Sequence, residues 1–194
     1  MKLYIPSTRI RIDCDDDSGP HFSNDCVHPD ADEEWKDWNR LGDPVLHIDL
    51  RDWADMMVVA PLSAHSLAKF ATGLCDDTLS CVVRAWDFGQ TSRPGKPMVL
   101  APAMNTAMWQ HPLTRQQLST IMQFYSEEKQ QSHFVLVDPQ VKQLACGEEG
   151  DGALASVARI LEAVKESLAA VETKIEMEAL SNLPAGTKQT LDLI

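Results

Sequence analysis

Two short apolar runs, each followed by a proline, constrain the fold of this chain most strongly. The first run is Met56–Ala60, which precedes Pro61, and the second is Met98–Ala101, which precedes Pro102. Neither run alternates between apolar and polar residues, and such continuous runs are typical of strands buried on both faces of a parallel sheet. Because parallel strands end at the same edge of a sheet, we expect the polar segments after both runs to form a ligand-binding edge.

Helical patterns alternate with these strands. Ser63 is a suitable N-cap for a helix over Ala64–Leu74, with Gly73 as its terminator. Further patterns predict a helix beginning at Cys75–Asp77, a helix from Pro112 to about Lys129, a third buried strand over Phe134–Asp138 and an amphipathic helix over Val157–Leu168. We also expect a short strand or strand-like turn over Val45–Leu50, one helical turn over Arg51–Asp55, a Gly-rich loop over Gln140–Gly152 and fraying from Glu172 onward. The alternation predicts a three-layer α/β sandwich around a parallel sheet of the Rossmann or flavodoxin type.

The overall charge limits the partners of this protein. Its 194 residues fit a single domain and carry a formal net charge of −12. A chain this acidic is expected to bind neither nucleic acid nor an anionic membrane surface, although backbone amides can still bind a small anionic ligand. No apolar run approaches the roughly 18 residues of a membrane span, and the N-terminus has no apolar signal core.

The cysteines indicate a reducing compartment. There are five of them, an odd number at irregular spacing, which does not suit a disulfide framework. One of them, Cys146, lies in the Gly-rich loop, where a thiol can take part in chemistry only if it stays reduced. We therefore expect the protein to be cytoplasmic.

Two patterns near the N-terminus invite a metal interpretation. The acidic segment Asp13–Pro20 resembles a calcium loop but lacks the later bidentate Glu that such loops need, so we interpret it as a solvated loop. Cys14, His21, Cys26 and His28 are potential zinc ligands, but nothing shows Cys-x-x-Cys spacing. We therefore predict no metal site.

Several polar residues have simple structural interpretations when taken alone. His47 lies between apolar residues, where a histidine is more often a satisfied core residue than a catalytic one. Asn105 by itself is a good turn former, and Met108 would simply pack. Cys146 stands in a Gly-rich loop rather than in a core segment, and a thiol there could donate a proton late in a reaction.

Three longer strings of residues stand out. They are Val45–Leu50 (Val-Leu-His-Ile-Asp-Leu), Pro102–Trp109 (Pro-Ala-Met-Asn-Thr-Ala-Met-Trp) and Ala145–Ala153 (Ala-Cys-Gly-Glu-Glu-Gly-Asp-Gly-Ala). Together they resemble the motifs of the flavin-dependent cysteine decarboxylases, most closely the branch that acts in coenzyme A synthesis. The resemblance divides the chain into a divergent, loop-rich segment (1–29), a flavoprotein decarboxylase domain (30–181) and a flexible tail (182–194).

This resemblance implies a reaction and two catalytic residues. The reaction is the FMN-dependent decarboxylation of 4′-phosphopantothenoylcysteine to 4′-phosphopantetheine. In the family a histidine at the position of His47 is the acid–base residue, and its titration range suits proton transfer near neutral pH. A cysteine at the position of Cys146 protonates the product in the reductive step. The family forms trimers with active sites between subunits, so a homo- or hetero-trimer is implied.

The resemblance also implies the residues that contact the ligands. Those expected to bind the substrate are Asn105, Met108, Gln143, Ala145 and Leu154, with the Asn105 amide on the carboxylate. Those expected to bind FMN are Ser63, Ala64, His65, Ser66 and Ala103. This sequence departs from the family at His65 and Ser66, where Asn and Thr are usual, and at Gln143, which replaces a basic residue near the substrate phosphate.

The largest departure concerns the start of the chain. The family opens with a strand, a Gly-Ser-x-Ala loop and a helix that hold the flavin phosphate. None of the 46 residues before His47 matches this unit, so we expect an N-terminally incomplete sheet and weak FMN binding by the chain alone. An incomplete gene, a natural truncation and a diverged subunit all remain open as explanations.

Two alternative functions follow from the same resemblance. The first is a non-catalytic or regulatory subunit of a hetero-trimer, like the phosphatase-inhibiting, salt-tolerance members of the family, whose acidic extensions the acidic N-terminus weakly resembles. The second is a peptidyl-cysteine decarboxylase of peptide maturation. The strings at Val45–Leu50 and around Cys146 favour the coenzyme A branch over the second alternative.

Overall fold

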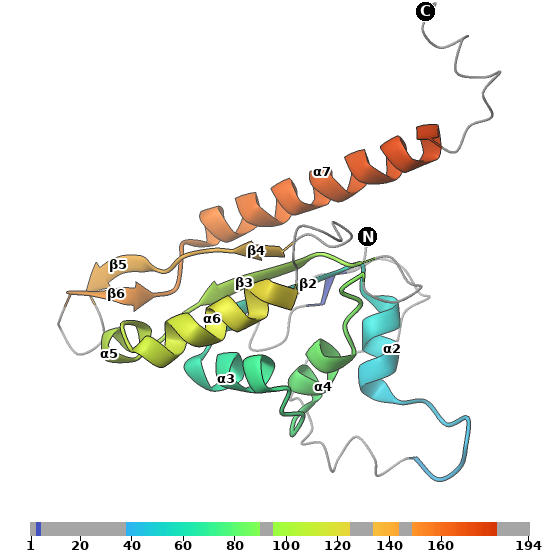
Figure 1. Ribbon diagram of the computed structural model, residues 1–194, viewed down its shortest axis with the longest axis horizontal. Helices are drawn as coiled ribbons and strands as arrows, with labels where there is room; N and C mark the ends of the chain where they lie inside the picture. Colours follow the sequence, from blue (N-terminus) through green and yellow to red (C-terminus); the bar gives the residue numbers. More distant parts are fainter. Residues whose placement is uncertain (1–2, 5–37, 90–94, 125–133, 144–148, 182–194) are drawn as a thin grey trace, which may run out of the picture.

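A computed structural model describes residues 3–4, 38–89, 95–124, 134–143 and 149–181. In this part of the chain, the strands form a parallel sheet in the order β1-β2-β3-β4 and an antiparallel hairpin of β5 and β6 (Figure 1). Their bounds are β1 Leu3–Tyr4, β2 Met56–Leu62, β3 Met98–Pro102, β4 Phe134–Leu136, β5 Gln140–Gln143 and β6 Glu149–Ala153. The two apolar runs that precede prolines are therefore strands, as the sequence predicted.

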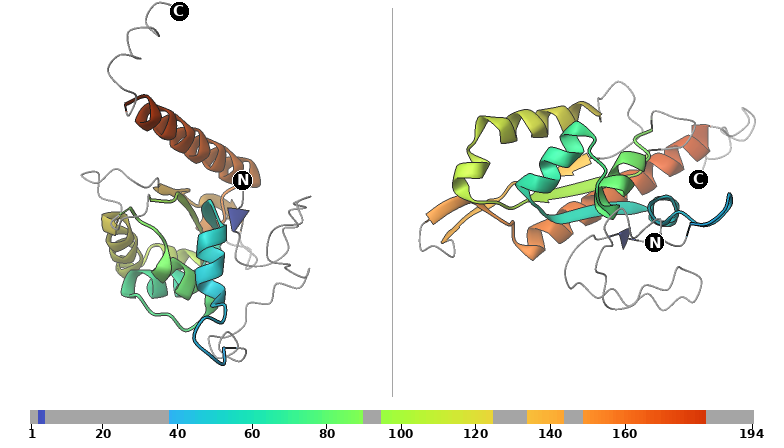
Figure 2. Two further views of the ribbon diagram at one scale, coloured as in Figure 1. Left: turned by 90° about the vertical axis from the view of Figure 1, so that its right-hand side faces the viewer. Right: turned by 90° about the horizontal axis from the view of Figure 1, so that it is seen from below.

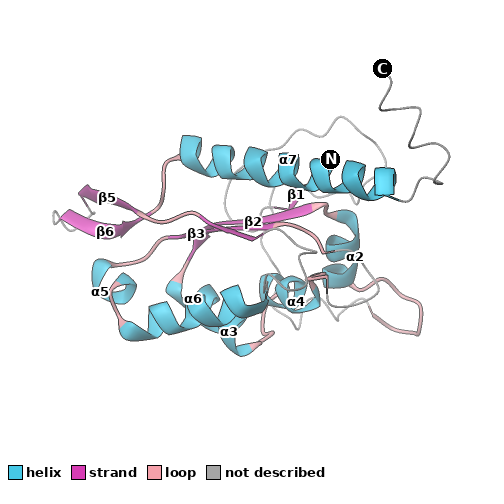
Figure 3. Ribbon diagram, turned by 45° about the horizontal axis from the view of Figure 1, so that its top comes forward, coloured by secondary structure: helices cyan, strands magenta, loops and turns pink. Residues whose placement is uncertain are grey.

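Helices cover both faces of the parallel sheet. They are α2 Leu46–Trp53, α3 Ala64–Thr72, α4 Thr78–Ala85, α5 Thr106–Trp109, α6 Pro112–Phe124 and α7 Val157–Ser181. Figure 3 shows α7 on one face, and α2, α3, α4 and α6 on the other. The predicted three-layer α/β sandwich is confirmed. No helix in the described ranges is both long and apolar enough to cross a membrane.

The central strand β2 explains why an uninterrupted apolar run was needed. Met57 and Val59 belong to the core cluster beneath α2, α3, α4 and α6, whereas Met56 and Val58 belong to the cluster beneath α7. All four are at most 3% exposed. Successive side chains of a strand point to opposite faces. A strand between two helical layers therefore buries both sets of side chains, and a polar residue would be unfavourable on either face.

The helix α2 corrects one sequence prediction. Val45–Leu50 was expected to be a strand or strand-like turn, but α2 begins at Leu46 and takes in most of the segment assigned to a single helical turn. The physical reason is that Leu46, Leu50 and Trp53 recur at helical spacing and contact the same core cluster. A window ending at Leu50 is too short to show that period.

The hairpin and α7 correct two further predictions. Gln140–Gly152 was expected to be a loop, but its two ends form the paired strands β5 and β6, with Gln143 opposite Glu149. The helix α7 continues to Ser181, well into the segment that was expected to fray from Glu172. The helix α6 is described from Pro112 to Phe124, and the rest of the helix predicted to run to about Lys129 lies outside the described ranges.

Several sequence predictions fall on residues that the structure does not describe. They include most of the 1–29 segment with its potential calcium and zinc ligands, Ala145, Cys146 and the 182–194 tail. The proposed domain boundaries likewise remain predictions. Among the described residues, no group of three or more His, Cys, Asp or Glu side chains is arranged to bind a metal ion.

Candidate active site

The ends of β2 and β3 bring two predicted site segments together. Leu62 pairs with Pro102 where the two strands finish, after a register shift that follows Val59. The Ala103 amide then donates a hydrogen bond to the Leu62 carbonyl at 3.0 Å. As a result, Ser63, which directly follows β2, lies at the same carboxyl edge of the sheet as Ala103.

The first of these segments is the start of α3. Ser63 is its N-cap, and its hydroxyl oxygen accepts a hydrogen bond from the Ser66 amide at 3.1 Å. The first amides of a helix have no acceptor within the helix, so those of Ala64 and His65 are available to a ligand. The side chain of His65 is exposed, whereas Ser63, Ala64 and Ser66 are half-buried. The predicted cap at Ser63 and the αL terminator at Gly73, with φ of 74°, are both confirmed.

The second segment is the turn that starts α5. Asn105 is the N-cap of this helix, and its Oδ1 accepts a hydrogen bond from the Ala107 amide at 2.9 Å. Within the described part of the chain, Nδ2 of Asn105 has no hydrogen-bond partner, so this group can donate to a ligand. Met108, in the same short helix, is 50% exposed. The turn therefore presents an amide donor and a flexible apolar side chain side by side.

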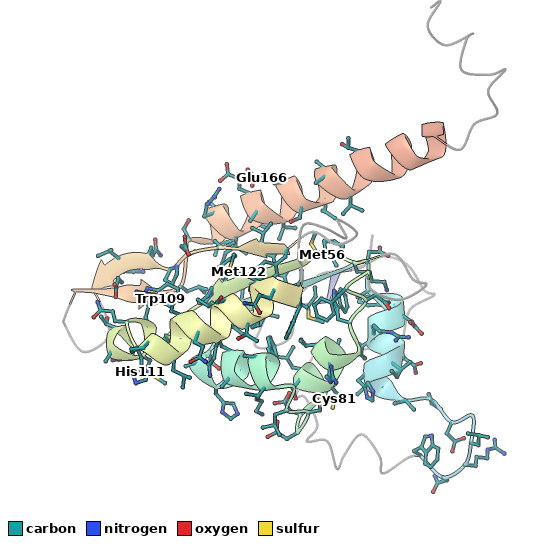
Figure 4. All side chains as sticks on the ribbon, viewed as in Figure 1. Met56, Cys81, Trp109, His111, Met122 and Glu166 are labelled. Carbon is teal, nitrogen blue, oxygen red and sulfur yellow. The ribbon has the colours of Figure 1, made fainter. Side chains whose placement is uncertain are left out.

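The β5–β6 hairpin packs against this turn. The Met104 amide donates to the Gly152 carbonyl at 2.9 Å, and Nε2 of Gln110 donates to Oδ2 of Asp151 at 3.1 Å. Figure 4 shows Trp109 and His111, at the corner between α5 and α6, at the same end of the molecule as the hairpin. Nothing local in the sequence pointed to Gln110 or Asp151, because they are 41 positions apart.

The remaining substrate-side residues are located only in part. Gln143 is the last residue of β5, and Leu154 follows β6, where its carbonyl accepts a hydrogen bond from Nε2 of Gln140 at 2.7 Å. Leu154 is half-buried against the core beneath α7. Ala145 and Cys146 belong to the connection between β5 and β6. This connection lies outside the described residues.

His47 lies at the opposite edge of the sheet. It is half-buried near the start of α2, and α2 leads into the amino end of β2. Seven residues of β2 at about 3.3 Å each separate that end from Ser63 by about 23 Å. Figures 1 and 2 show α2 at one end of the molecule and the α5 and β5–β6 region at the other. One copy of the chain therefore does not bring His47 to Asn105.

Two charged groups that link α3 to α4 have shifted pKa values. The buried Lys69 ammonium contacts Asp76 and Asp77, each at 2.5 Å. Burial alone lowers the pKa of Lys69, but the hydrogen bonds and charges of the two carboxylates outweigh burial and raise it. Burial likewise raises the pKa of Asp77, but Lys69 and Ser80 outweigh it and hold that pKa below 3.8. This cluster joins α3 to α4 and stabilises the layer that carries Ser63.

A cavity lies away from the carboxyl edge of the sheet. A cavity of about 450 Å³ is lined by the ends of α3 and α6, by α4 and by aromatic side chains that include Phe70, Trp86, Phe88 and Phe124. Gly73 and Leu74, at the far end of α3 from Ser63, also line it. The cavity and the candidate site are therefore at different ends of α3.

Comparisons with known proteins agree with these motifs. A family model described as Flavoprotein matches residues 18–169. The phosphopantothenoylcysteine decarboxylase of Mus musculus is 48% identical over 142 residues, which cover 73% of this chain and 62% of that protein. A probable phosphopantothenoylcysteine decarboxylase of Arabidopsis thaliana is 47% identical over 133 residues, 69% of this chain and 59% of that protein. The chain thus spans about three fifths of the length of these relatives.

Solved structures show the same relationship. A PPC decarboxylase mutant complexed with pantothenoylaminoethenethiol superposes with a TM-score of 0.60 at 44% sequence identity, covering 71% of this chain and 68% of that chain. The FMN binding protein AtHal3 superposes with a TM-score of 0.56 at 44% identity, covering 71% and 66%. The resemblance found in the sequence is confirmed, and this chain belongs to the flavoprotein family.

Proposed function

We propose that this protein catalyses the FMN-dependent decarboxylation of 4′-phosphopantothenoylcysteine to 4′-phosphopantetheine, a carbon–carbon lyase step of coenzyme A biosynthesis. The observation that carries the proposal is the Asn105 turn: its Oδ1 is engaged within the turn, its Nδ2 is available, and the turn stands at the carboxyl edge of β3. The names of the relatives above support the same substrate.

The residues at the carboxyl edge suit a flavin ring. Ser63, Ala64, His65, Ser66 and Ala103 would hold it, since they offer free helix amides and a hydroxyl to ring carbonyls and small side chains beside the ring. Oγ1 of Thr106 is buried and has no hydrogen-bond partner in the described residues, which leaves a polar atom at this edge for a ligand. FMN, when bound there, supplies a reversible acceptor of two electrons.

Asn105 is proposed to bind the carboxylate that is lost. A neutral amide donor orients a carboxylate without the strong stabilisation that a cation would give, and such stabilisation would oppose the loss of carbon dioxide. Met108, Ala145 and Leu154 would contact the rest of the substrate, and Gln143 would face its phosphate. Because Gln143 is uncharged where the family resemblance implies a basic residue, we expect weaker phosphate binding here.

His47 is proposed to move the proton at the reacting cysteinyl end. A histidine can do this near neutral pH because both of its protonation states are populated there. Since His47 and Asn105 stand at opposite edges of the sheet, the proposal requires the His47 of one copy to meet the Asn105 of another. A homo-trimer with sites between copies would satisfy this requirement. Cys146 is proposed to protonate the product at the end of the reaction.

Reconstitution of the purified protein with FMN tests this function. The protein should turn yellow, release carbon dioxide from 4′-phosphopantothenoylcysteine and form 4′-phosphopantetheine, as followed by mass spectrometry. Titration with FMN tests in addition the expectation that the chain alone binds it weakly. A flavin-loaded protein that releases no carbon dioxide from this substrate would contradict the proposed activity.

A second candidate is a non-catalytic or regulatory subunit acting in a hetero-trimer. The departures at His65, Ser66 and Gln143 favour it, since they change residues expected to contact FMN and the substrate. Native mass spectrometry of the chain mixed with a complete homologue distinguishes the two, because only a subunit of this kind requires mixed trimers for its activity.

A further inference from the structure

One lysine ties the end of α2 to the start of β3. Nζ of Lys96 donates hydrogen bonds to the carbonyl of Arg51 at 2.6 Å and to that of Ala54 at 2.8 Å. The last carbonyls of a helix have no amide partners within the helix, and the helix dipole places partial negative charge there. A lysine ammonium donates hydrogen bonds to such carbonyls and also carries a positive charge that offsets the partial negative charge. Lys96 therefore caps the C-terminal end of α2 from 42 or more positions along the chain.

Lys96 is itself held in place on several sides. Its amide donates to the Asp87 carbonyl at 2.8 Å, and Nε1 of Trp86 donates to the Lys96 carbonyl at 3.2 Å. Its ammonium lies 5.6 Å from the centre of the Trp86 ring, within the range of a cation–π interaction. Trp86 is buried, so the lysine is anchored to the core rather than to a surface segment. The connection from Asp87 to Lys96 is therefore closed at its base.

The charged surroundings of Lys96 do not explain its position. Burial lowers its pKa from 10.5, the charges of Asp87, Asp52 and Asp55 oppose that shift, and Arg51 adds to it. Within the described residues, its hydrogen bonds go to main-chain carbonyls and not to a carboxylate. This partly buried ammonium donates hydrogen bonds to two main-chain carbonyls, which suggests that it fixes the backbone at the end of α2.

We propose that Lys96 is a positioning residue for His47. It fixes the C-terminal end of α2 against the sheet, and His47 precedes Arg51 by one helical turn on the same short helix. Leu50 and Ala54 are buried and set the depth of α2, whereas Lys96 provides the directional bonds that set its tilt. The inference rests on the catalytic role proposed above for His47.

The test compares Lys96→Met, which keeps most of the side-chain volume but removes the donors, with Lys96→Arg, which keeps a cation and donors. The exposed Lys165 of α7, replaced by Met, is the matched control for the loss of a lysine. In Lys96→Met, amide hydrogen exchange over 50–54 should accelerate by about 10- to 100-fold, while α3 and α4 keep the exchange rates of the parent. The His47 imidazole resonances should shift. Lys96→Arg should restore most of the protection, and Lys165→Met should change nothing.

The kinetic result separates positioning from general destabilisation. With FMN and substrate, kcat of Lys96→Met should fall by about tenfold or more while KM stays within about twofold of the parent, because a small misplacement of a catalytic group lowers kcat. Equal acceleration of exchange in all helices, or unchanged exchange in α2, would overturn the role of Lys96. If Lys96→Met does not fold, the same measurements on Lys96→Arg decide the question. A Lys96→Arg protein whose α2 amides are not protected from hydrogen exchange would overturn the positioning role of Lys96. A parent protein that releases no carbon dioxide would contradict the proposed function alone, because the exchange experiment does not depend on turnover.

Discussion

Gly152 and Met104 are in backbone contact at the wall of the candidate site. A Cβ atom on Gly152 would lie 2.2 Å from the Met104 carbonyl oxygen, and the Met104 amide donates to the Gly152 carbonyl at 2.9 Å. Only glycine permits this approach. The β5–β6 hairpin and the Asn105 turn are consequently held as one unit.

Replacing Gly152 by Ala should therefore separate the hairpin from the Asn105 turn. Since the obstructing atom belongs to the backbone, we expect a loss of about 1–3 kcal/mol in the free energy of unfolding and a large loss of activity. Denaturant unfolding and carbon dioxide release measure the two effects. Gly42→Ala is the contrasting variant, because Gly42 has nothing within 4 Å but a φ of 100°. It should lose stability through backbone strain and keep its activity, and a Gly152→Ala protein that behaves in the same way would contradict the prediction.

The bond between Gln110 and Asp151 should contribute to the same contact. In a double-mutant cycle, Gln110→Ala, Asp151→Ala and the double variant should show a coupling energy of about 0.5–1 kcal/mol, a modest value because the hydrogen bond itself is exposed to solvent. Asp151→Asn keeps an acceptor for Gln110 and should behave like the parent. Additive losses in the double variant would show that the two side chains act independently.

The Lys69 cluster predicts a pH dependence of stability. Lys69→Met should cost about 1–3 kcal/mol, because the lysine is buried while Asp76 and Asp77 are partly exposed. The pKa of Asp77 is lowered in the folded state, so its contribution is present above its ordinary value of 3.8 and is lost as pH falls through the folded value. The pKa of Lys69 is raised, so its contribution is lost only as pH rises through a value above 10.5. The free energies of unfolding of parent and variant should differ by a constant amount from about pH 5 to 9, and this difference should shrink below about pH 4. A constant difference down to pH 3 would contradict this assignment.

His47 and Asn105 should complement one another between copies. His47→Asn and Asn105→Asp should each fold and each release no carbon dioxide, the first because the proton-transfer group is missing and the second because a carboxylate repels the substrate carboxylate. After the two are unfolded and refolded together at equal concentration, about one quarter of the sites should combine an intact His47 with an intact Asn105, if neighbouring copies meet head to tail. Carbon dioxide release by the mixture measures this. A mixture as inactive as its components would show that His47 and Asn105 do not form a catalytic site between copies.

Cys146 should act after decarboxylation. Cys146→Ser should release carbon dioxide at a rate close to that of the parent and accumulate an oxidised, enethiol-type product, because the hydroxyl of serine is a far weaker acid than a thiol. Mass spectrometry of the product distinguishes the enethiol from the thiol by two mass units. Normal yields of the fully reduced thiol would exclude the proposed role. Cys75→Ser is the control, since Cys75 lies on the surface between α3 and α4.

The parts of the structure that the sequence predicted are those with a local signal. The strands β2 and β3 are recognisable as apolar runs, and Ser63 and Gly73 mark the two ends of α3 within a single segment. The helix α2 was missed because its period becomes visible only when Trp53 is read together with Leu46. The motifs likewise directed attention to His47 and Asn105, but not to their separation.

The parts that were not predicted depend on distant contacts. The bonds of Lys96 to the end of α2 and of Gln110 to Asp151 each join positions about 40 apart, and no local pattern marks either residue. The hairpin was hidden because glycines suggest a loop, whereas one of them, Gly152, is required by packing, since the Met104 carbonyl occupies the place of its side chain. Such a requirement exists only once the chain has folded.

The separation of His47 from Asn105 along β2 has a consequence for how activity would depend on dilution. A pair of copies joined head to tail would hold a single complete catalytic centre, with one histidine and one asparagine left unused at its two ends. A third copy would join those ends and close the trimer. The number of complete catalytic centres would then rise from one per two chains to one per chain. Specific activity would then rise with protein concentration and fall sharply on dissociation, even where each separate chain stays folded.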